Sequence, residues 1–230
     1  MIDLQGFGPS LLAGTWMTVK LSLASVALGL LFGLLGAAGK TSNNAFARFL
    51  GGSYTTIVRG VPETLWVLMA YYSTVTALNY LGSFFGNPEL ALNPFAAGTL
   101  ALALCFGAYS SEVFRGALLS IPKGHREAGL AVGLSSLRIF WRITLPQVWR
   151  IALPGLGNLY LILLKDTALV SLISLTEIMR AAEIAKNGTK LPFTFYLIAA
   201  LIYLSLTVLV MIAMHFFEKR AAQGFTRNEV

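Results

Sequence analysis

Charged side chains are scarce in this sequence, and their scarcity excludes most classes of soluble protein. Only 12% of the 230 residues are Asp, Glu, Lys or Arg, and 56% are hydrophobic. In an ordinary soluble domain, roughly a quarter of the residues are charged. Cysteine is scarcer still, because Cys105 stands alone and no intrachain disulfide can form. The composition predicts an integral membrane protein with Cys105 as a small buried hydrophobic side chain.

The residue patterns that carry catalysis or hold metal ions are also missing. His125 and His215 lie far apart, and no spacing of His, Cys and carboxylate residues fits a metal site. No G-x-S-x-G segment marks a serine nucleophile. The stretch GLLGAAGKT at 33–41 resembles a phosphate-binding loop, but its glycines are separated by five residues instead of four and it ends an apolar helix. We therefore predict no catalytic residue, no metal and no cofactor bound by this chain.

Long apolar runs are abundant instead, and they predict the spans of an all-α membrane protein. A helix needs about 20 mostly apolar residues to cross the hydrocarbon core of a bilayer. Five runs meet or approach that length: 11–37, 61–82, 94–119, 147–172 and 193–217. No Lys or Arg precedes Lys20, so the first run lacks the basic start of a cleaved signal peptide and is expected to remain. Only short polar segments separate the runs, which predicts a single domain over residues 1–230.

Small residues in the first run predict a close helix contact. Gly29 and Gly33 form a GxxxG pair, and Gly36 and Gly39 continue the same small-residue face. Such a face lets the backbone of another helix approach closely in a membrane. We interpret these glycines as structural.

The basic residues are distributed unevenly between the predicted spans, and their distribution predicts the orientation. Cytoplasmic loops of membrane proteins carry an excess of Lys and Arg. Three segments share one side on this criterion, with Lys40, Arg48, Arg59, Lys123, Arg126, Arg138, Arg142, Lys219, Arg220 and Arg227. We predict a periplasmic N-terminus and a cytoplasmic C-terminus. The loop at 173–192 is the exception, because Arg180, Lys186 and Lys190 fall on the outer side.

A polar segment at 123–146 interrupts the apolar runs on the predicted cytoplasmic side. A short helix is expected at about 125–132, and Gly133 permits a break because it lacks a side chain. Ser135 is a candidate N-cap for a second short helix. Pro146 suits the first turn of the fourth span. Such a helix, hinge and helix outside the membrane offer an element that another protein can grip.

The same segment resembles the EAA motif of permease subunits of bacterial ABC importers. In that motif, E-A-x is followed by three residues, a glycine, nine further residues and I-x-L-P. The matching residues are Glu127, Ala128, Gly133, Ile143, Leu145 and Pro146. Gly129 departs from the motif, which usually has a second alanine there, and glycine is expected to loosen the helix slightly.

Three further stretches extend the resemblance over nearly the whole chain. They are RGVPET at 59–64, GAYSSEVFRGALLSIPKGHREA at 107–128 and LKDTALVSLISLTEIM at 164–179. These stretches are similar to permeases that import polar amino acids, most of all to Q-type subunits of histidine and lysine/arginine/ornithine systems. The resemblance implies a type I ABC importer transmembrane domain in the bacterial inner membrane, with five transmembrane helices and a cytoplasmic coupling helix.

The resemblance also implies a division of labour between several chains. A second permease subunit, expected to be a paralogue, completes the path. Two copies of a cytoplasmic ABC ATPase bind ATP and Mg, and a periplasmic binding protein delivers the amino acid. Within the coupling helix, Glu127 would contact a basic residue of the ATPase, besides favouring the first helical turn. The implied substrate is a basic amino acid (arginine, ornithine, lysine or histidine), with another polar amino acid or an opine as the alternative.

Charged residues inside spans are costly and are therefore candidates for substrate contact. They are Glu63, Glu112, Arg115 and Asp166. A carboxylate facing the path would give a cationic side chain a charge-assisted hydrogen bond. The carboxylate of the amino acid would need a donor, for which Thr167, Ser171 or a helix N-terminus is suited. Glu112 has a structural alternative, because Arg115 stands three residues further along the helix and can pair with it.

Several alternatives stay open at this point. A self-contained secondary transporter would need inverted repeats and helices broken near the middle of the membrane, and neither is visible. A membrane enzyme would need a catalytic cluster. Nucleic acid binding is disfavoured because the basic residues do not gather with aromatic ones. In importers of this kind the partner permease can also hold the pocket, and this chain would then only line the path.

Overall fold

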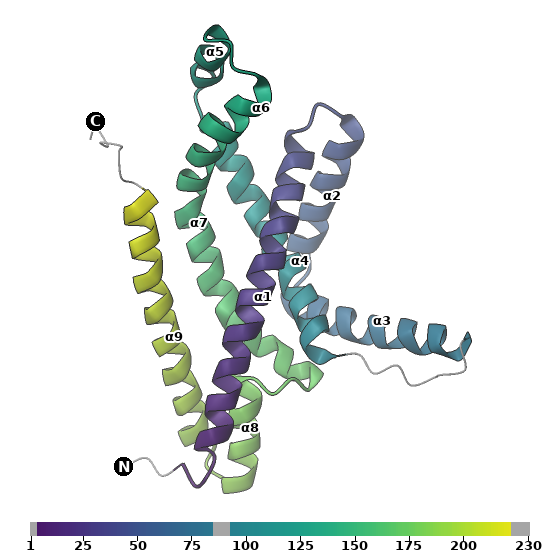
Figure 1. Ribbon diagram of the computed structural model, residues 1–230. Helices are drawn as coiled ribbons and strands as arrows, with labels where there is room; N and C mark the ends of the chain where they lie inside the picture. Colours follow the sequence, from purple (N-terminus) through teal and green to yellow (C-terminus); the bar gives the residue numbers. More distant parts are fainter. Residues whose placement is uncertain (1–3, 85–92, 222–230) are drawn as a thin grey trace.

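The computed structural model describes residues 4–84 and 93–221, and these residues form helices without strands (Figure 1). In chain order the elements are α1 (Gly8–Thr41), α2 (Ala45–Gly60), α3 (Glu63–Phe84), α4 (Pro94–Leu119), α5 (Lys123–Ala131), α6 (Ser136–Ile139), a π-helical turn (Phe140–Thr144), α7 (Leu145–Asp166), a 3-10 helix (Thr167–Ile173), α8 (Ile178–Thr189) and α9 (Pro192–Ala221). Helices satisfy their backbone hydrogen bonds internally, as a bilayer requires. The predicted all-α fold is confirmed. Most of the loop at 83–93, and Arg227, lie outside the described residues.

The contact between α1 and α4 is the most extensive in the bundle, and glycines make it possible. Gly29, Gly33 and Gly36 all face α4. A Cβ atom on Gly29 would lie 2.8 Å from Cδ1 of Phe106, which is closer than any real contact of that kind. Gly39 faces α2 instead. The predicted small-residue face is therefore confirmed, and it serves two neighbouring helices.

Four helical stretches of the described chain are long and apolar enough to cross a membrane. They are Gly8–Thr41, Pro94–Leu119, Ser136–Ile173 and Pro192–Ala221. The predicted span at 61–82 does form a helix, α3, but α3 is not among these four. In Figure 1, α3 leaves the bundle at a steep angle to α1. The sequence therefore predicted the helix correctly, and the structure does not support α3 as a span by itself.

The helix α2 was not expected from the sequence. It starts from Asn44, whose side chain accepts hydrogen bonds from two backbone N–H groups, and it returns alongside α1. Val61 ends it in an extended conformation, with φ −115° and ψ 136°. Pro62 explains this ending, because the residue before a proline is disfavoured in the helical region. The proline thus creates the corner between α2 and α3, at the start of which Glu63 lies.

The fourth predicted span, 147–172, lies within a longer helical stretch. The helix is continuous from Ser136, so the second short helix of the polar segment is not separate from the span. A π-helical turn joins them, in which the N–H of Leu145 bonds to the carbonyl of Phe140. Pro146 explains the wide turn, because it has no N–H for the usual bond and its ring crowds the carbonyl of Arg142.

The predicted hinge at Gly133 is confirmed in detail. Gly133 has a φ of 79°, in the region that side chains disfavour. The N–H of Gly133 bonds to Leu130 O at 2.9 Å, and the N–H of Leu134 bonds to Gly129 O at 3.0 Å. This pair of bonds forms a Schellman motif, the common glycine-dependent end of a helix. Ser135 occupies the predicted N-cap position of α6, but its side chain makes no capping hydrogen bond.

The polar segment and α8 lie at opposite ends of the bundle (Figure 1). The end with α8 is the end where α1 begins, and there the loop predicted at 173–192 is largely a helix packed on α1 and α9. Two of its basic residues have partners: Arg180 pairs with Glu183 at 2.7 Å, and Lys186 donates to the Tyr196 hydroxyl at 2.9 Å. Arg180 and Lys186 therefore belong to a folded surface helix.

Candidate functional site

Two of the predicted substrate residues line the same small cavity, which we name the acidic cavity. Glu63 lies in the first turn of α3 and Asp166 at the end of α7, and apolar side chains, Cys105 and Tyr109 complete the wall. No basic residue lines it. The cavity measures about 20 Å³, so a ligand requires it to open. The fold thus brings together two carboxylates that are far apart in the sequence.

The two carboxylates of the acidic cavity have few internal partners. Glu63 Oε1 accepts a hydrogen bond of 2.9 Å from the hydroxyl of Tyr109. Asp166 has neither a hydrogen bond nor an ion pair within the described part of the chain. A carboxylate in a membrane-spanning segment is costly unless it is paired. A cation supplied from outside the chain would stabilise both groups.

A second and larger cavity, which we name the basic cavity, measures about 390 Å³. Its wall is built from α1, α2 and α4 and contains Lys40, Thr55, Thr56, Arg59, Gly60, Tyr109 and Glu112. Glu112 is bound on one oxygen by Lys40 Nζ and on the other by Arg115 Nε at 2.8 Å. Glu112 and Arg115 therefore form the ion pair that the structural alternative predicts. Its carboxylate is already neutralised by two cations.

Tyr109 separates the two cavities and touches the charged groups of both. Its hydroxyl donates to Glu63 on the acidic side. On the basic side, the Arg59 guanidinium carbon lies 5.2 Å from the centre of its ring. Arg59 comes no nearer than 4.0 Å to the carboxylate of Glu112. A single aromatic ring thus stands between a site of excess negative charge and a site of excess positive charge.

The other two candidates, Thr167 and Ser171, do not line either of these cavities. Thr167 is fully buried, donates to the carbonyl of Leu164 at 2.7 Å and lies 3.4 Å from the Tyr203 hydroxyl. Although Thr167 follows Asp166 directly, its side chain is engaged in the packing between the 3-10 helix and α9. Ser171 is half-buried in the same 3-10 helix. Neighbourhood in sequence did not place these hydroxyls with the carboxylates.

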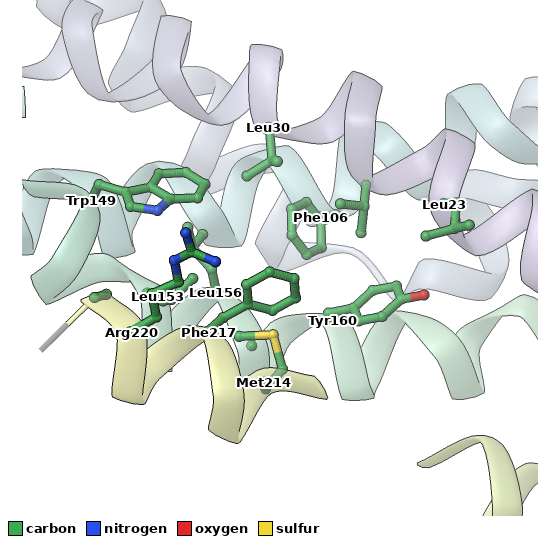
Figure 2. A pocket seen from close by; sticks show the side chains of 13 residues that line it. Leu23, Leu30, Phe106, Trp149, Leu153, Leu156, Tyr160, Met214, Phe217 and Arg220 are labelled. Carbon is green, nitrogen blue, oxygen red and sulfur yellow. The ribbon is translucent and has the colours of Figure 1, made fainter. Parts of the chain in front are cut away.

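An apolar cavity of about 450 Å³ lies between α1, α4, α7 and α9. Figure 2 shows Trp149 and Arg220 at one end of it, Leu23 and Tyr160 at the other, and Phe106 between them. Its wall contains no carboxylate. A polar amino acid would find few partners there, because burying a polar group without a hydrogen bond is costly. The charged groups that could recognise such a ligand lie in the acidic and basic cavities.

The residues of the EAA pattern lie around one short helix and its hinge. Glu127 and Ala128 are exposed on α5, and Gly133 forms the hinge. Ile143 packs beneath α5, beside a Cβ position on Gly129 that would be only 2.9 Å from Cγ1 of Ile139. Glycine at position 129 therefore has a physical reason, since an alanine methyl group would press on Ile139. Leu145 and Pro146 form the start of α7.

Comparison with known proteins decides the family. A family model described as the binding-protein-dependent transport system inner membrane component matches residues 29–223. The chain belongs to this family. The histidine/lysine/arginine/ornithine transport system permease protein HisQ of Escherichia coli (strain K12) is 38% identical, over 99% of this chain and 100% of HisQ. The octopine transport system permease protein OccQ of Rhizobium meliloti is 39% identical, over 99% of this chain and 98% of OccQ.

Solved structures agree with the family assignment. The crystal structure of an amino acid ABC transporter with histidines matches with a TM-score of 0.78 and 29% identity, over 96% of this chain and 99% of that chain. The protein is therefore a multi-pass inner-membrane permease component, a non-catalytic subunit of an ABC importer. As the family description indicates, such a component works with a binding protein, and ABC transport is driven by an ATPase.

One important residue of this permease component was missed by reasoning from the sequence. Glu177, which lies in the loop predicted at 173–192, is fully buried. Its carboxylate accepts hydrogen bonds from the N–H groups of Met179 (2.8 Å) and Arg180 (2.9 Å) and from the Tyr203 hydroxyl (2.9 Å). Burial raises the pKa of Glu177, although these donors oppose the rise. The available signal was the position of an acidic residue directly before a helix.

Proposed function

We propose that this permease component imports amino acids with a cationic side chain, and that Glu63 and Asp166 bind that cation. The observation that carries the proposal is the acidic cavity, where two carboxylates meet without a basic residue in the wall. An ammonium or guanidinium group between them would form charge-assisted hydrogen bonds and relieve their mutual repulsion. The relative HisQ, named for histidine, lysine, arginine and ornithine, supports a basic amino acid. OccQ, named for octopine, supports an opine as the second candidate.

We further propose that the chain crosses the membrane five times and forms a single domain over residues 1–230. In this arrangement α2 and α3 together make the crossing that neither makes alone, with the corner at Pro62 inside the membrane. The segment at 123–146 and the C-terminus would be cytoplasmic, and the N-terminus and α8 periplasmic. The basic residues around α5 support this orientation.

The surface of α3 supports a second permease subunit as partner. Leu65, Met69 and Tyr72 on α3 are exposed, and among the described elements α3 packs mainly against α4 and the 3-10 helix. Inside a membrane such an apolar surface is covered either by lipid or by another protein. In the proposed assembly, the paralogous permease covers α3, and the path lies between the two subunits.

The polar segment is the proposed coupling element for the ATPase, which binds ATP and Mg. Its residues are Glu127, Ala128, Gly133, Ile143, Leu145 and Pro146. Val132 and Trp141 near the hinge are 75% and 60% exposed, which suits a protein partner better than water. Because α6 continues into α7 without a break, a displacement of this element passes directly to a membrane span.

The test of the proposed function is uptake by the complete transporter. The two permease subunits, the ATPase and the binding protein are reconstituted into liposomes, and labelled L-arginine is measured inside. We expect uptake that requires ATP, and Glu63→Gln or Asp166→Asn is expected to raise the half-saturating substrate concentration about tenfold or more.

Glu183→Gln is the matched control, since it removes a carboxylate from the exposed pair on α8. Uptake by this permease without the ATPase would favour the secondary-transporter alternative. Undiminished L-arginine uptake by both the Glu63 and the Asp166 variant would contradict the assigned cation site.

A further inference from the structure

We propose that Arg59 binds the carboxylate of the transported amino acid, while Glu63 and Asp166 hold its cationic side chain on the opposite side of Tyr109. The proposal rests on the function proposed above and adds the group that recognises the anionic end of the substrate. The donors expected for that end, Thr167 and Ser171, line neither charged cavity. A different donor is therefore needed close to the acidic cavity.

Arg59 is the cation of the basic cavity that is available for an anion. Lys40 is engaged by Glu112 and by the Thr55 hydroxyl at 2.9 Å, and Arg115 is engaged by Glu112. The Arg59 guanidinium, with 43% of the side chain exposed, lies 4.0 Å from Glu112 and makes no hydrogen bond within the described residues. Its five N–H donors suit a carboxylate, which they can bind with two parallel hydrogen bonds.

The balance of charge points in the same direction. The basic cavity has Lys40 and Arg59 in its wall and Arg115 beside it, against the single carboxylate of Glu112. The acidic cavity has two carboxylates and no cation in its wall, and Lys165 next to Asp166 adds one positive charge beside it. Across Tyr109 the protein therefore presents excess positive charge to one end of a ligand and excess negative charge to the other. A basic amino acid has the complementary arrangement, with its carboxylate at one end and its side-chain cation at the other.

The dimensions of this arrangement follow from Tyr109. Its ring lies 5.2 Å from the Arg59 guanidinium, and its hydroxyl lies 2.9 Å from Glu63. The Arg59 guanidinium thus lies over the ring of Tyr109, and Glu63 lies at its hydroxyl. Both ends of one ligand could therefore be bound next to the same tyrosine side chain. Tyr109 is the wall along which the aliphatic part of the substrate would lie.

The experiment compares two ligands that differ only at the carboxylate. Equilibrium binding of L-arginine and of L-argininamide is measured on the assembled transporter in lipid nanodiscs. The wild type is expected to prefer L-arginine. Arg59→Gln is expected to weaken L-arginine binding about ten- to hundredfold, as loss of a charge-assisted pair does, and to leave L-argininamide binding within about twofold. Arg59→Lys is expected to recover part of the loss, because it keeps the charge without the fork of donors.

Arg48→Gln is the matched control on the same helix, because its guanidinium bonds the carbonyls of Ser42 and Asn43 outside both cavities. Equal losses for both ligands in Arg59→Gln would overturn the proposal, since Arg59 would then only shape the site. Unchanged L-arginine affinity in that variant would overturn it as well. If the wild type binds no L-arginine, the proposed function itself fails, and the inference fails with it.

Discussion

The basic and acidic cavities lie on either side of Tyr109, and they differ in how the protein treats its carboxylates. Glu112 in the basic cavity is held by Lys40 and Arg115. Glu63 and Asp166 in the acidic cavity have no cation within hydrogen-bonding distance in the described chain. An ion pair such as Lys40–Glu112 links the two helices that carry its residues. A buried carboxylate without a cation costs free energy unless a ligand or a partner subunit supplies the positive charge. The first arrangement is structural, and the second is suited to transport.

The largest loss of stability is expected from breaking the ion pair of Glu112 in the basic cavity. Lys40→Met leaves Glu112 with one of its two close partners and removes the hydrogen bond to Thr55. We expect a loss of about 3 kcal/mol in stability, because the partly buried Glu112 loses one of its two close ion pairs and Thr55 loses its hydrogen bond with Lys40. Thermal unfolding in detergent would measure it. The control is Lys40→Met combined with Glu112→Met, which removes both charges and should regain much of the loss; an equal loss in both variants would contradict the pairing.

Glu177 is a carboxylate whose partners are hydrogen-bond donors instead of cations. The loss of stability expected from its substitution is somewhat smaller. Glu177→Ala removes the cap of α8 and leaves the Tyr203 hydroxyl without this acceptor, for a loss of about 2 kcal/mol. Thermal unfolding against pH is the measurement.

Glu177→Gln tests the direction of the pKa shift of Glu177. Burial raises the pKa of Glu177, so the stability due to its protonated form is present at low pH and declines as the pH rises through that pKa. The stability of the wild type relative to that of Glu177→Gln should therefore fall as the pH increases. A difference between the two proteins that does not vary with pH would contradict the raised pKa.

Glu127 extends the comparison to a carboxylate in water. It is exposed on α5, so its substitution should affect neither folding nor substrate binding. Glu127→Arg is expected to lower substrate-stimulated ATP hydrolysis about tenfold, since it reverses a charge at the proposed contact with the ATPase. Gly133→Pro, which cannot adopt the φ of 79°, should have the same consequence for coupling. Normal coupling in both variants would argue against a coupling role for the segment.

The smallest effect is expected at the exposed pair on α8. Glu183→Gln breaks the 2.7 Å ion pair between Arg180 and Glu183, and both side chains are exposed to water. The expected change is about 0.3 kcal/mol, as for other surface pairs on one helix. It should be compared with Lys40→Met under the same thermal unfolding conditions. A similar loss in the two variants would remove the distinction between structural and surface ion pairs.

The features predicted correctly from the sequence are those that neighbouring residues specify. The hinge at Gly133, the short helix before it and the glycine face of α1 depend on spacing within a few turns. The corner at Pro62 and the π-helical turn before Pro146 also have local causes, but apolar runs alone do not reveal them. For this reason the joining of the second short helix to the fourth span was not predicted, and neither was α2.

The candidate site was predicted as a set of residues and not as an arrangement. The cost of charge in a membrane singled out Glu63, Glu112 and Asp166 one by one. Their different surroundings depend on Lys40 and Tyr109, which other parts of the chain supply. Arg115, three residues after Glu112, is a local sign that Glu112 is paired, whereas nothing local indicates that Glu63 faces the acidic cavity. Thr167 directly follows Asp166 but lines neither charged cavity, because adjacent residues on a helix point in different directions.

The most direct test of the central claim measures stability and binding in one experiment. The assembled transporter with wild-type permease, and with the double substitution Glu63→Gln and Asp166→Asn, is unfolded thermally with and without saturating L-arginine. We predict that the double variant is at least as stable as the wild type without ligand, because the repulsion between two unpaired carboxylates is gone. We also predict that L-arginine raises the Tm of the wild type and leaves that of the double variant unchanged. A double variant that is less stable and still responds to L-arginine would contradict the claim.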